Sequence, residues 1–370
     1  MNALGIINFE DNTVEIDGLG EYRPVPAMVF MGRYRIIDIM LSNMTNSGIN
    51  SVQVYCKEKP RNLIEHLGSG QRYNINSKRG KLRVLYGEKM FSSLVYNTDI
   101  ENFRLNMQYI ERDPNPYVVI APSYFVYPID FTTVLKQHLD TNADVTVLYT
   151  STNEAKTSFL NCDVVTVDKE KKITAFGKNR GNTKNRLISL EAYVMRKSLF
   201  IDLVEKAANT SSLYWFKDIL ADSVESLNIR GYQVRGYVAC LNTLEEYYRN
   251  CMELKHPGIS AQLFKADWPI YTQTSDTCPT HFSREGTAKD SVIANGCMIE
   301  GEVSGSILGR NVKIERGAIV HNCNIIGENV IGKNVHLENV VVDKYAEVKN
   351  IDKLVGTYTE PVYVKRRDRI

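Results

Sequence analysis

The residues Leu-Gly-Arg-Asn-Val at positions 308–312 return with small changes as Ile-Gly-Glu-Asn-Val at 326–330 and as Ile-Gly-Lys-Asn-Val at 331–335. The first two copies begin 326 − 308 = 18 positions apart, which is the length of three six-residue units. Such repeats are typical of a triangular β-helix, in which aliphatic side chains point inward and Gly and Asn take the tight corners. We therefore predict a left-handed β-helix of hexapeptide repeats over residues 290–370, with a meander of short antiparallel strands as the alternative.

Residues 1–254 carry a different pattern, in which short β-rich runs alternate with helical ones. Residues 117–120 and 144–149 are β-rich, whereas 131–140 and 199–208 have helical patterns. Strands that alternate with helices favour an α/β domain with a Rossmann-like, mostly parallel sheet that is covered on both faces. Ligands of such sheets bind beyond the carboxyl ends of the strands, so site residues are expected in the loops there.

The two patterns are separated by residues 255–289, which are rich in Pro, Thr and Ser. This composition is typical of a linker, and a chain of 370 residues is long enough for two domains. We predict an α/β domain at 1–254 and a β-helix domain at 290–370 that ends in a basic tail.

The composition is that of an ordinary globular protein. Charged residues make up 24% of the chain and the net charge is only +2, which gives no reason to expect nucleic acid or a membrane surface as a partner. The seven cysteines include no Cys-x-x-Cys pair, so neither zinc nor a disulfide framework is indicated, and dispersed thiols suit a reducing cytoplasm. Without a basic segment near Met1 or a long apolar run, we expect a cytoplasmic protein.

Several motifs point to one family. The stretch Gly-Arg-Tyr-Arg-Ile-Ile-Asp at 32–38, followed by Leu-Ser-Asn at 41–43 and Asn-Ser-Gly-Ile at 46–49, resembles the start of a sugar-1-phosphate nucleotidyltransferase. Lys-Asp-Ile-Leu at 217–220 and Trp-Pro-Ile-Tyr-Thr at 268–272 extend a resemblance to the ADP-glucose pyrophosphorylases over nearly the whole chain. The resemblance implies a nucleotidyltransferase domain of the GT-A type before the β-helix. It also implies a reaction in which ATP and glucose 1-phosphate give ADP-glucose and pyrophosphate.

The positions where that family binds the ATP phosphates hold other residues here. After the first predicted strand the family has a Gly-Gly-x-Gly loop, whose backbone N–H groups cradle phosphate. Here the loop reads Asn-Phe-Glu-Asp at 8–11, so side chains would obstruct phosphate and two acids would repel it. In the family's Arg-x-Lys-Pro-Ala motif, Arg23 is kept and Val25 stands in place of the lysine.

The two metal-binding aspartates of the family are also replaced. The first belongs in a Gly-Asp-His context, where this sequence offers Ser123 or Tyr124. The second belongs in the motif at 236–243, where Cys240 takes its place. A thiol is a poor ligand for hard Mg²⁺. The resemblance therefore implies that no catalytic residue is intact, that this chain binds no metal or other cofactor, and that Mg²⁺ acts only in a catalytic partner.

Part of the sugar-phosphate site is retained. Lys178 matches the family's phosphate-binding lysine, and Ser189 matches the first residue of its Ser-x-Gly-x-Tyr motif. Glu191 replaces the glycine of that motif and would crowd a sugar phosphate and oppose its charge. Taken alone, Lys178 is more simply explained as a solvated surface lysine.

A set of arginines suggests a regulatory site. Arg23 and Arg35 match arginines with which the family binds anionic effectors near the β-helix, and Arg33 lies between them in the sequence. Guanidinium groups suit bidentate recognition of a phosphate- or sulfate-like effector. The alternative is a structural ion pair, for example with Asp38. The basic run at 365–369 is best explained as a solvated tail.

These observations predict a catalytically silent, regulatory subunit of ADP-glucose pyrophosphorylase. The resemblance implies a heterotetramer with a catalytic subunit, and a homotetramer is possible for the chain alone. One alternative is an active nucleotidyltransferase with unusual metal ligands. The other is a hexapeptide-repeat acyltransferase, for which His321 and His336 are the candidate catalytic residues within the repeats.

Overall fold

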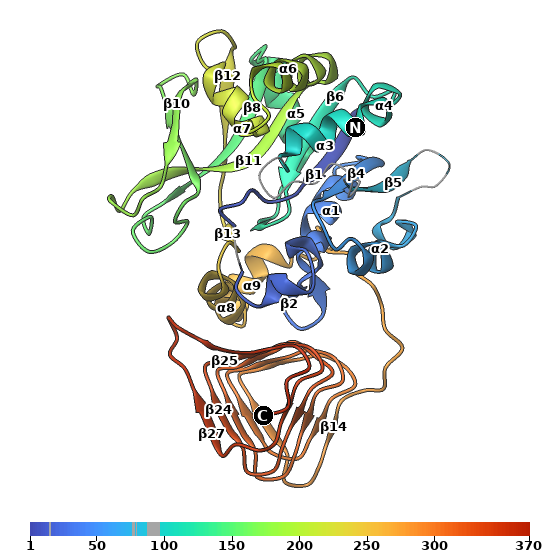
Figure 1. Cartoon of the computed structure of the whole chain (residues 1–370), viewed down its shortest axis with the longest axis vertical. Coiled ribbons are helices and arrows are strands. Elements are labelled where there is room, and N and C mark those ends of the chain that lie inside the picture. Colours follow the sequence, from blue (N-terminus) through green and yellow to red (C-terminus); the bar gives the residue numbers. More distant parts are fainter. Residues whose placement is uncertain (15, 76–77, 79, 87–96) are drawn as a thin grey trace.

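The computed structural model describes residues 1–14, 16–75, 78, 80–86 and 97–370. Figure 1 shows an α/β domain beside a β-helix, with α8, α9 and β2 on the side of the α/β domain that faces the coils. The predicted order of an α/β domain followed by a β-helix is confirmed. None of the described helices is long and apolar enough to cross a membrane.

The α/β domain is built on a mixed sheet with the strand order β10-β9-β11-β6-β1-β4-β5, and β8 pairs with both β11 and β12. β1, β4, β5 and β6 run parallel, as do β8 and β12, whereas β11 runs antiparallel to β6, β8 and β9. Leu4 and Ile7, on opposite faces of β1, are both buried, as expected for a central strand covered on both faces. The strands of this sheet are β1 Ala3–Asn8, β4 Ser51–Cys56, β5 Lys81–Tyr86, β6 Tyr117–Pro122, β8 Val145–Thr152, β9 Asp163–Val167, β10 Ile173–Lys178, β11 Arg186–Arg196 and β12 Ile229–Val234.

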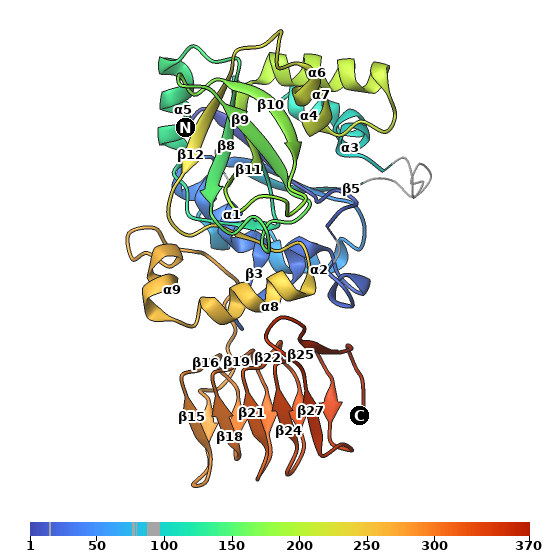
Figure 2. The same ribbon diagram turned by 90° about the vertical axis from the view of Figure 1, so that its left-hand side faces the viewer.

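Helices lie on both faces of this sheet (Figures 1 and 2). The motif at 32–38 ends in α1, whose first ten residues are all buried. Asp38 caps α1, because its carboxylate accepts from the backbone N–H of Arg35 at 2.8 Å. The helices are α1 Ile36–Asn46, α2 Arg61–Leu67, α3 Asp99–Leu105, α4 Met107–Glu111, α5 Phe131–Asp140, α6 Lys197–Thr210, α7 Phe216–Asp222, α8 Leu244–Glu253 and α9 Pro257–Leu263.

Two short strand pairs complete the domain near the β-helix. β2 (Val29–Phe30) pairs with β3 (Tyr34–Arg35), and β7 (Phe125–Val126) pairs with β13 (Ala239–Cys240), both antiparallel. The second pair joins two segments more than a hundred residues apart, and the site described below is built on it.

The β-helix consists of three parallel five-stranded sheets, one on each face of the triangle. Figure 2 shows β15, β18, β21, β24 and β27 side by side on one of these faces. The first sheet contains β14 His281–Phe282, β17 Met298–Ile299, β20 Lys313–Ile314, β23 Val330–Ile331 and β26 Glu347–Val348. The second contains β15 Thr287–Lys289, β18 Glu302–Ser304, β21 Ile319–His321, β24 His336–Glu338 and β27 Lys353–Val355. The third contains β16 Val292–Ile293, β19 Ile307–Leu308, β22 Asn324–Ile325, β25 Val340–Val342 and β28 Val362–Val364.

Most coils are shorter than the sequence spacing suggests. Leu308 pairs with Ile325 rather than with Ile326, so one coil takes 325 − 308 = 17 residues. The buried Val320 and Ile325 on successive faces are 5 positions apart, whereas Ile325 and Ile331 are 6 apart, so one corner of the triangle lacks a residue. Asn and Gly take the corners as predicted; Asn334, for example, has a φ of 60°.

The β-helix begins earlier than residue 290. β14 and β15 already pair with the next coil, so residues from His281 onward belong to the β-helix. The remainder of the span 255–289 starts with α9 and continues as a strap along α1. The indole N–H of Trp268 donates to Asn43 Oδ1 at 2.8 Å, and the backbone N–H of Tyr271 donates to Ser42 Oγ at 2.8 Å.

Candidate functional site

The two positions that would carry the metal-binding aspartates lie side by side. Tyr124 follows β6, and Cys240 in β13 lies opposite Phe125 of β7. The backbone N–H of Leu241 donates to the carbonyl oxygen of Tyr124 at 2.9 Å. Two motifs that are distant in the sequence therefore meet at one place beyond the carboxyl end of β6.

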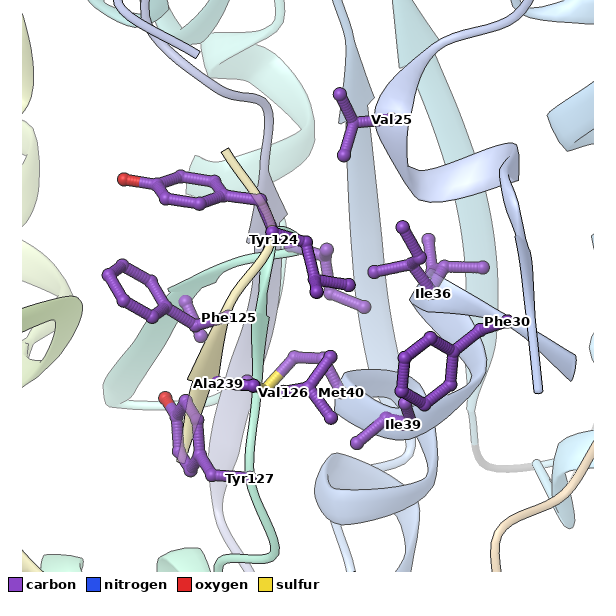
Figure 3. Close-up of a cluster of buried hydrophobic side chains, with 14 of the residues drawn as sticks. Val25, Phe30, Ile36, Ile39, Met40, Tyr124, Phe125, Val126, Tyr127 and Ala239 are labelled. Atoms are coloured by element: carbon purple, nitrogen blue, oxygen red, sulfur yellow. The ribbon is translucent and has the colours of Figure 1, made fainter. Parts of the chain in front are cut away.

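These positions are packed as part of the hydrophobic core. Ser123, Tyr124 and Cys240 are 0%, 3% and 1% exposed, and the rings of Tyr124 and Phe125 have centroids 4.7 Å apart. Figure 3 shows Tyr124, Phe125 and Val25 within one cluster of buried apolar side chains. Mg²⁺ prefers carboxylate and water oxygens, so a phenol, a thiol and apolar neighbours do not fit it. Among the described residues, no group of three or more His, Cys, Asp or Glu side chains could hold a metal ion.

A buried charged cluster lies next to these positions. Lys217 of α7 forms ion pairs with three carboxylates: Asp11, Glu191 at 3.2 Å and Asp163 at 3.6 Å. We call these four residues the lysine cluster. Asp11 lies in the turn after β1, where it also accepts from the backbone N–H of Thr13 at 2.8 Å. The loop that binds phosphate in the family is thereby tied to a lysine of the same chain.

A β-bulge directs Glu191 toward Lys217. The register of β11 against β8 shifts between Ser189 and Ala192, and Glu191 has a φ of 49°, which is rare for a residue with a side chain. Bulges redirect side chains in this way next to functional sites. Here the redirected side chain is an acid at the position where the family carries a glycine.

The electrostatics of the lysine cluster keep Lys217 charged. Burial would lower the pKa of Lys217, but Glu191, Asp163 and Asp11 outweigh this effect and raise it. Burial would raise the pKa of Asp11, but Lys217 outweighs it and lowers that pKa. Burial raises the pKa of Glu191 although Lys217 opposes it. The cluster is therefore a stable arrangement around one ammonium group.

The two residues predicted to bind sugar phosphate are both engaged inside the protein. Lys178 Nζ lies 2.6 Å from Asp163 Oδ1, although the side chain of Lys178 remains 38% exposed. Ser189 is buried, and its Oγ accepts from the backbone N–H of Glu191 at 3.3 Å. Asp163 thus lies between Lys178 and Lys217 and offsets positive charge that a phosphate group would need.

Asp99 links the elements that surround the lysine cluster. Its carboxylate accepts from the backbone N–H of Phe216 at 2.9 Å and from the side chain of Asn8 at 2.7 Å, so it connects β1, α3 and α7. Burial raises the pKa of Asp99 to about 7. The carbonyl oxygen of the Asn8 side chain is buried without a partner among the described residues, and rotation of that amide would let protonated Asp99 donate to it.

Arg23 is a structural residue, which corrects its prediction as an effector ligand. Its Nη2 donates to both carboxylate oxygens of Asp343 at 2.7 Å, and Tyr363 donates to the same carboxylate at 3.0 Å. Arg23 is 3% and Asp343 0% exposed. The partner is therefore an aspartate of the β-helix and not Asp38, while Arg23 Nη1 has no hydrogen-bond partner among the described residues.

Arg35 is also engaged inside the chain. Its Nη1 donates to the carbonyl oxygen of Ala27 at 2.8 Å, and burial together with the nearby charge of Arg23 lowers its pKa. Asp38 does not pair with the Arg35 side chain, because it accepts from Tyr73 at 2.6 Å and lies 2.6 Å from His66 Nε2. The effector role predicted for Arg35 is therefore not supported by its position.

Arg33 alone of the three arginines is exposed, and it lines a cleft between the domains. This junction cleft has a volume of about 590 Å³ and is also lined by Tyr34, Lys255, Phe264 and Arg310. The rings of Tyr34 and Phe264 stack with centroids 5.3 Å apart. Arg310 donates from Nη2 to the carbonyl oxygen of Gln273 at 2.8 Å, while its Nε has no partner among the described residues. Burial and the charge of Arg33 lower the pKa of Arg310.

The histidines of the β-helix give no support for an acyltransferase. His321 is held at both ring nitrogens, with Ser304 Oγ 2.8 Å from Nδ1 and Asn322 Nδ2 3.0 Å from Nε2. His336 lies 3.9 Å from Glu338 on the outside of the coil.

Comparison with known proteins gives matches for both domains. Residues 18–236, more than half of the chain, match the family model described as Nucleotidyl transferase, and residues 275–360 match that described as GlmU-like, C-terminal hexapeptide. The Glycogen biosynthesis protein GlgD of Geobacillus stearothermophilus is 36% identical over 86% of this chain and 82% of its own length. The chain belongs to the glucose-1-phosphate adenylyltransferase family.

Other members of the adenylyltransferase family match along nearly the full length. GlgD of Bacillus subtilis is 30% identical over 98% of this chain and 95% of its own length. The Glucose-1-phosphate adenylyltransferase of Fervidobacterium nodosum is 28% identical over 99% of this chain and 88% of its own length. These matches therefore include both domains of this chain.

The sequence analysis assigned no role to several residues of this region, among them Asp163, Arg310 and Asp343. Asp163, Arg310 and Asp343 belong to ordinary strands and turns, and only the folded chain brings them to their partners. Arg310 lies within the first quoted repeat, where its side chain had no assigned role. Asp343 directly follows a β-rich run that ends in Val342. This sequence context did not predict its contact with Arg23.

Proposed function

We propose that this chain is a catalytically silent, regulatory subunit of glucose-1-phosphate adenylyltransferase in glycogen biosynthesis. Relatives that carry the names GlgD and Glucose-1-phosphate adenylyltransferase support a role in this pathway. Conversion of ATP and glucose 1-phosphate to ADP-glucose and pyrophosphate takes place on a catalytic partner subunit, which supplies the Mg²⁺ site.

The observation that carries the proposal is the ammonium group of Lys217 among Asp11, Asp163 and Glu191. Nucleotidyl transfer needs carboxylates that hold a divalent cation next to the α-phosphate. In this chain the carboxylates nearest to Tyr124 are paired with a lysine of the chain itself. The positions of the metal ligands are filled by Tyr124 and Cys240, which are buried.

The loop after β1 adds a second obstacle. Asp11 is bound to Lys217, and Glu10 has a buried carboxylate oxygen without a partner among the described residues. The sequence Asn-Phe-Glu-Asp at 8–11 offers neither glycine backbone nor positive charge to a triphosphate. The turn disfavours ATP on both steric and electrostatic grounds.

Assembly with other subunits follows from the open first coil of the β-helix. β14, β15 and β16 each pair on one side only, so three strand edges lie at this end. Phe282 of β14 is 43% exposed at the same end. Solenoids require their ends to be covered, and open edges pair readily with other chains. We expect a heterotetramer with the catalytic subunit, and a homotetramer when the chain is alone.

The junction cleft is the proposed effector site. Arg33 and Arg310 come from different domains, and Lys255, which follows the C-cap of α8, also lines the cleft. An anion that binds both arginines would connect the α/β domain to the β-helix and so transmit binding to the assembly. A phosphate- or sulfate-like group suits guanidinium donors, and the stacked rings of Tyr34 and Phe264 offer an apolar wall beside it.

The proposal is tested by mixing the purified chain with the catalytic subunit of the same organism. Mass is followed by light scattering, and ADP-glucose formation is followed while inorganic phosphate is titrated. We expect a mixed assembly whose phosphate response differs from that of the catalytic subunit alone. A chain that remains a monomer and leaves the titration curve unchanged would contradict the proposal.

The alternative is an active enzyme with unusual metal ligands, because Asp11, Asp163 and Glu191 each contact Lys217, although these described residues are not arranged to hold a metal ion. In that case Lys217 would have to leave the cluster when Mg²⁺ binds. Lys217→Met would then increase Mg²⁺ binding and activity, whereas the silent subunit gains no activity from this change.

A further inference from the structure

Cys162 and Cys240 form a buried pair of thiols. Their Sγ atoms are 3.4 Å apart, and the two residues are 4% and 1% exposed. The chain has seven cysteines. Within the described part of the chain, no second contact between two thiols is found, and all seven cysteines are free.

The two segments that carry these thiols are held in register by several hydrogen bonds. Asn242, two residues after Cys240, donates to the carbonyl oxygen of Leu160 at 2.8 Å, two residues before Cys162. The backbone N–H of Asn179 donates to the carbonyl oxygen of Cys162 at 2.9 Å. On the other side, β13 is paired with β7. The sulfur atoms therefore face each other because the backbone on both sides is fixed.

From this geometry we infer that Cys162 and Cys240 are a site of reversible oxidation, at which a peroxide converts the two thiols into an intramolecular disulfide. A disulfide has an S–S distance of about 2.05 Å, so the sulfur atoms need to approach by roughly 1.3 Å, which small rotations of the two side chains can supply. The inference does not depend on the proposed regulatory function.

The reaction balances with hydrogen peroxide as the oxidant. One thiol, as its thiolate, attacks a peroxide oxygen, which forms a sulfenic acid and releases one molecule of water. The second thiol then attacks the sulfenic sulfur, which forms the S–S bond and releases a second molecule of water. Two thiols lose two electrons and two protons in total, and the peroxide is reduced to two molecules of water. A thiol reductant reverses the change by exchange.

Burial of the two thiols limits which oxidants can reach them and how fast they react. Hydrogen peroxide is small and uncharged, so local opening near the partly exposed Leu160 is enough to admit it. Burial and the neighbouring Cys162 raise the pKa of Cys240, so we expect the reaction to be slow. Cys278 is exposed and has no thiol neighbour among the described residues, so it serves as an internal standard for a thiol that oxidises without forming this bond.

The disulfide would join the sheet to the element that contacts the β-helix. Cys162 precedes β9, and Cys240 lies before α8, where Tyr248 donates to the carbonyl oxygen of Asn322 in the β-helix at 2.6 Å. The bond closes a segment of 240 − 162 = 78 positions. Closure of a segment of this length should raise the Tm by roughly 5 °C, since it restricts the unfolded chain.

The test treats the folded chain with hydrogen peroxide, blocks the remaining thiols after denaturation and maps the peptides by mass spectrometry. We expect a peptide in which Cys162 is joined to Cys240, with the loss of two hydrogen atoms, and a higher Tm that dithiothreitol reverses. Cys162→Ser and Cys240→Ser should each remove the joined peptide and the gain in Tm. Cys251→Ser, a change at another buried thiol, should leave both in place.

Two results would overturn the inference. One is that Cys162 and Cys240 both remain free to be blocked even after prolonged treatment with excess peroxide, continued long after Cys278 has been fully oxidised. The other is that either residue becomes a sulfinic acid while no joined peptide forms. If a serine variant does not fold, the corresponding alanine variant is used, and the peptide map of the unchanged chain decides the matter without either variant.

Discussion

Arg23 Nη2 lies 2.7 Å from each carboxylate oxygen of Asp343, although the two residues are 320 positions apart in the chain. The pair is buried and joins the α/β domain to the β-helix. Tyr363 contributes a further hydrogen bond to the same carboxylate. An arginine that the sequence suggested for an external anion thus pairs with an internal one.

Loss of the aspartate should therefore destabilise the protein strongly. Asp343→Ala leaves the Arg23 guanidinium buried without its counter-charge, which typically costs about 3–5 kcal/mol of unfolding free energy. Urea unfolding of the variant and the unchanged chain measures this difference. The double change Arg23→Met with Asp343→Leu removes both charges and should recover most of the loss. Equal stabilities of Asp343→Ala and the unchanged chain would show that the pair does not hold the domains together.

The effector response should depend on Arg33 and Arg310. Each charge-assisted hydrogen bond typically contributes about 1.5–3 kcal/mol, which corresponds to roughly 10- to 100-fold in affinity. Arg33→Ala or Arg310→Ala should weaken phosphate binding by the mixed enzyme by that factor and leave the maximal rate unchanged. Arg316→Ala is the matched control, because Arg316 is exposed on the β-helix away from the junction cleft. An equal loss of phosphate affinity in Arg316→Ala would contradict the assignment of the junction cleft as the effector site.

Stability should depend on pH through Asp99. Its pKa is raised from an ordinary value of 3.8 to about 7 in the folded protein. Between these values the folded state binds more protons than the unfolded state, so the unfolding free energy falls as pH rises, by about 1.4 kcal/mol per unit for a single group. This loss is complete above the folded pKa.

Asp99→Asn should remove that part of the pH dependence. The amide keeps an acceptor for the backbone of Phe216 and can donate to the free oxygen of Asn8. The variant should therefore be more stable than the unchanged chain above about pH 7 and should approach it near about pH 4. Denaturant titrations across this range measure the difference, and parallel curves for the two proteins would disprove the assignment.

Restoring carboxylates at the metal positions should not restore catalysis. Tyr124→Asp with Cys240→Asp would place two carboxylates in a region that is almost fully buried, where ionised groups are costly unless paired. The loop after β1 and Val25 would still lack phosphate donors. We expect a less stable protein without ADP-glucose formation, as followed by chromatography. Tyr127→Phe, a conservative change in the same core, controls for simple disturbance of packing.

The sequence was sufficient for the fold because the fold depends on repeated local signals. The spacing of aliphatic residues with Asn and Gly corners predicted the β-helix, and alternating strands and helices predicted the α/β domain. The predicted coil length was one residue too long for the coil between Leu308 and Ile325, because one side of that coil has five residues instead of six. Similar residues in successive repeats suggest a spacing, but the register of the strands is set by the hydrogen bonds between coils.

The candidate site could be predicted only in part. The chain places the two substituted metal positions, at Tyr124 and Cys240, next to each other, because each belongs to a local motif beside a strand. The roles of Arg23 and Arg35 could not be deduced, because their partners, Asp343 and the carbonyl group of Ala27, are set by tertiary contacts. The sequence does not distinguish an arginine that faces solvent from one that pairs with a buried carboxylate.

Catalytic silence is the central claim, and the chain alone tests it most directly. The purified chain, free of other subunits, is incubated with ATP, glucose 1-phosphate and Mg²⁺, and ADP-glucose is quantified beside a catalytic subunit prepared in the same way. With Lys217 among the three carboxylates and Tyr124 and Cys240 at the metal positions, we predict no product above background. Robust formation of ADP-glucose that disappears on removal of Mg²⁺ would contradict the account.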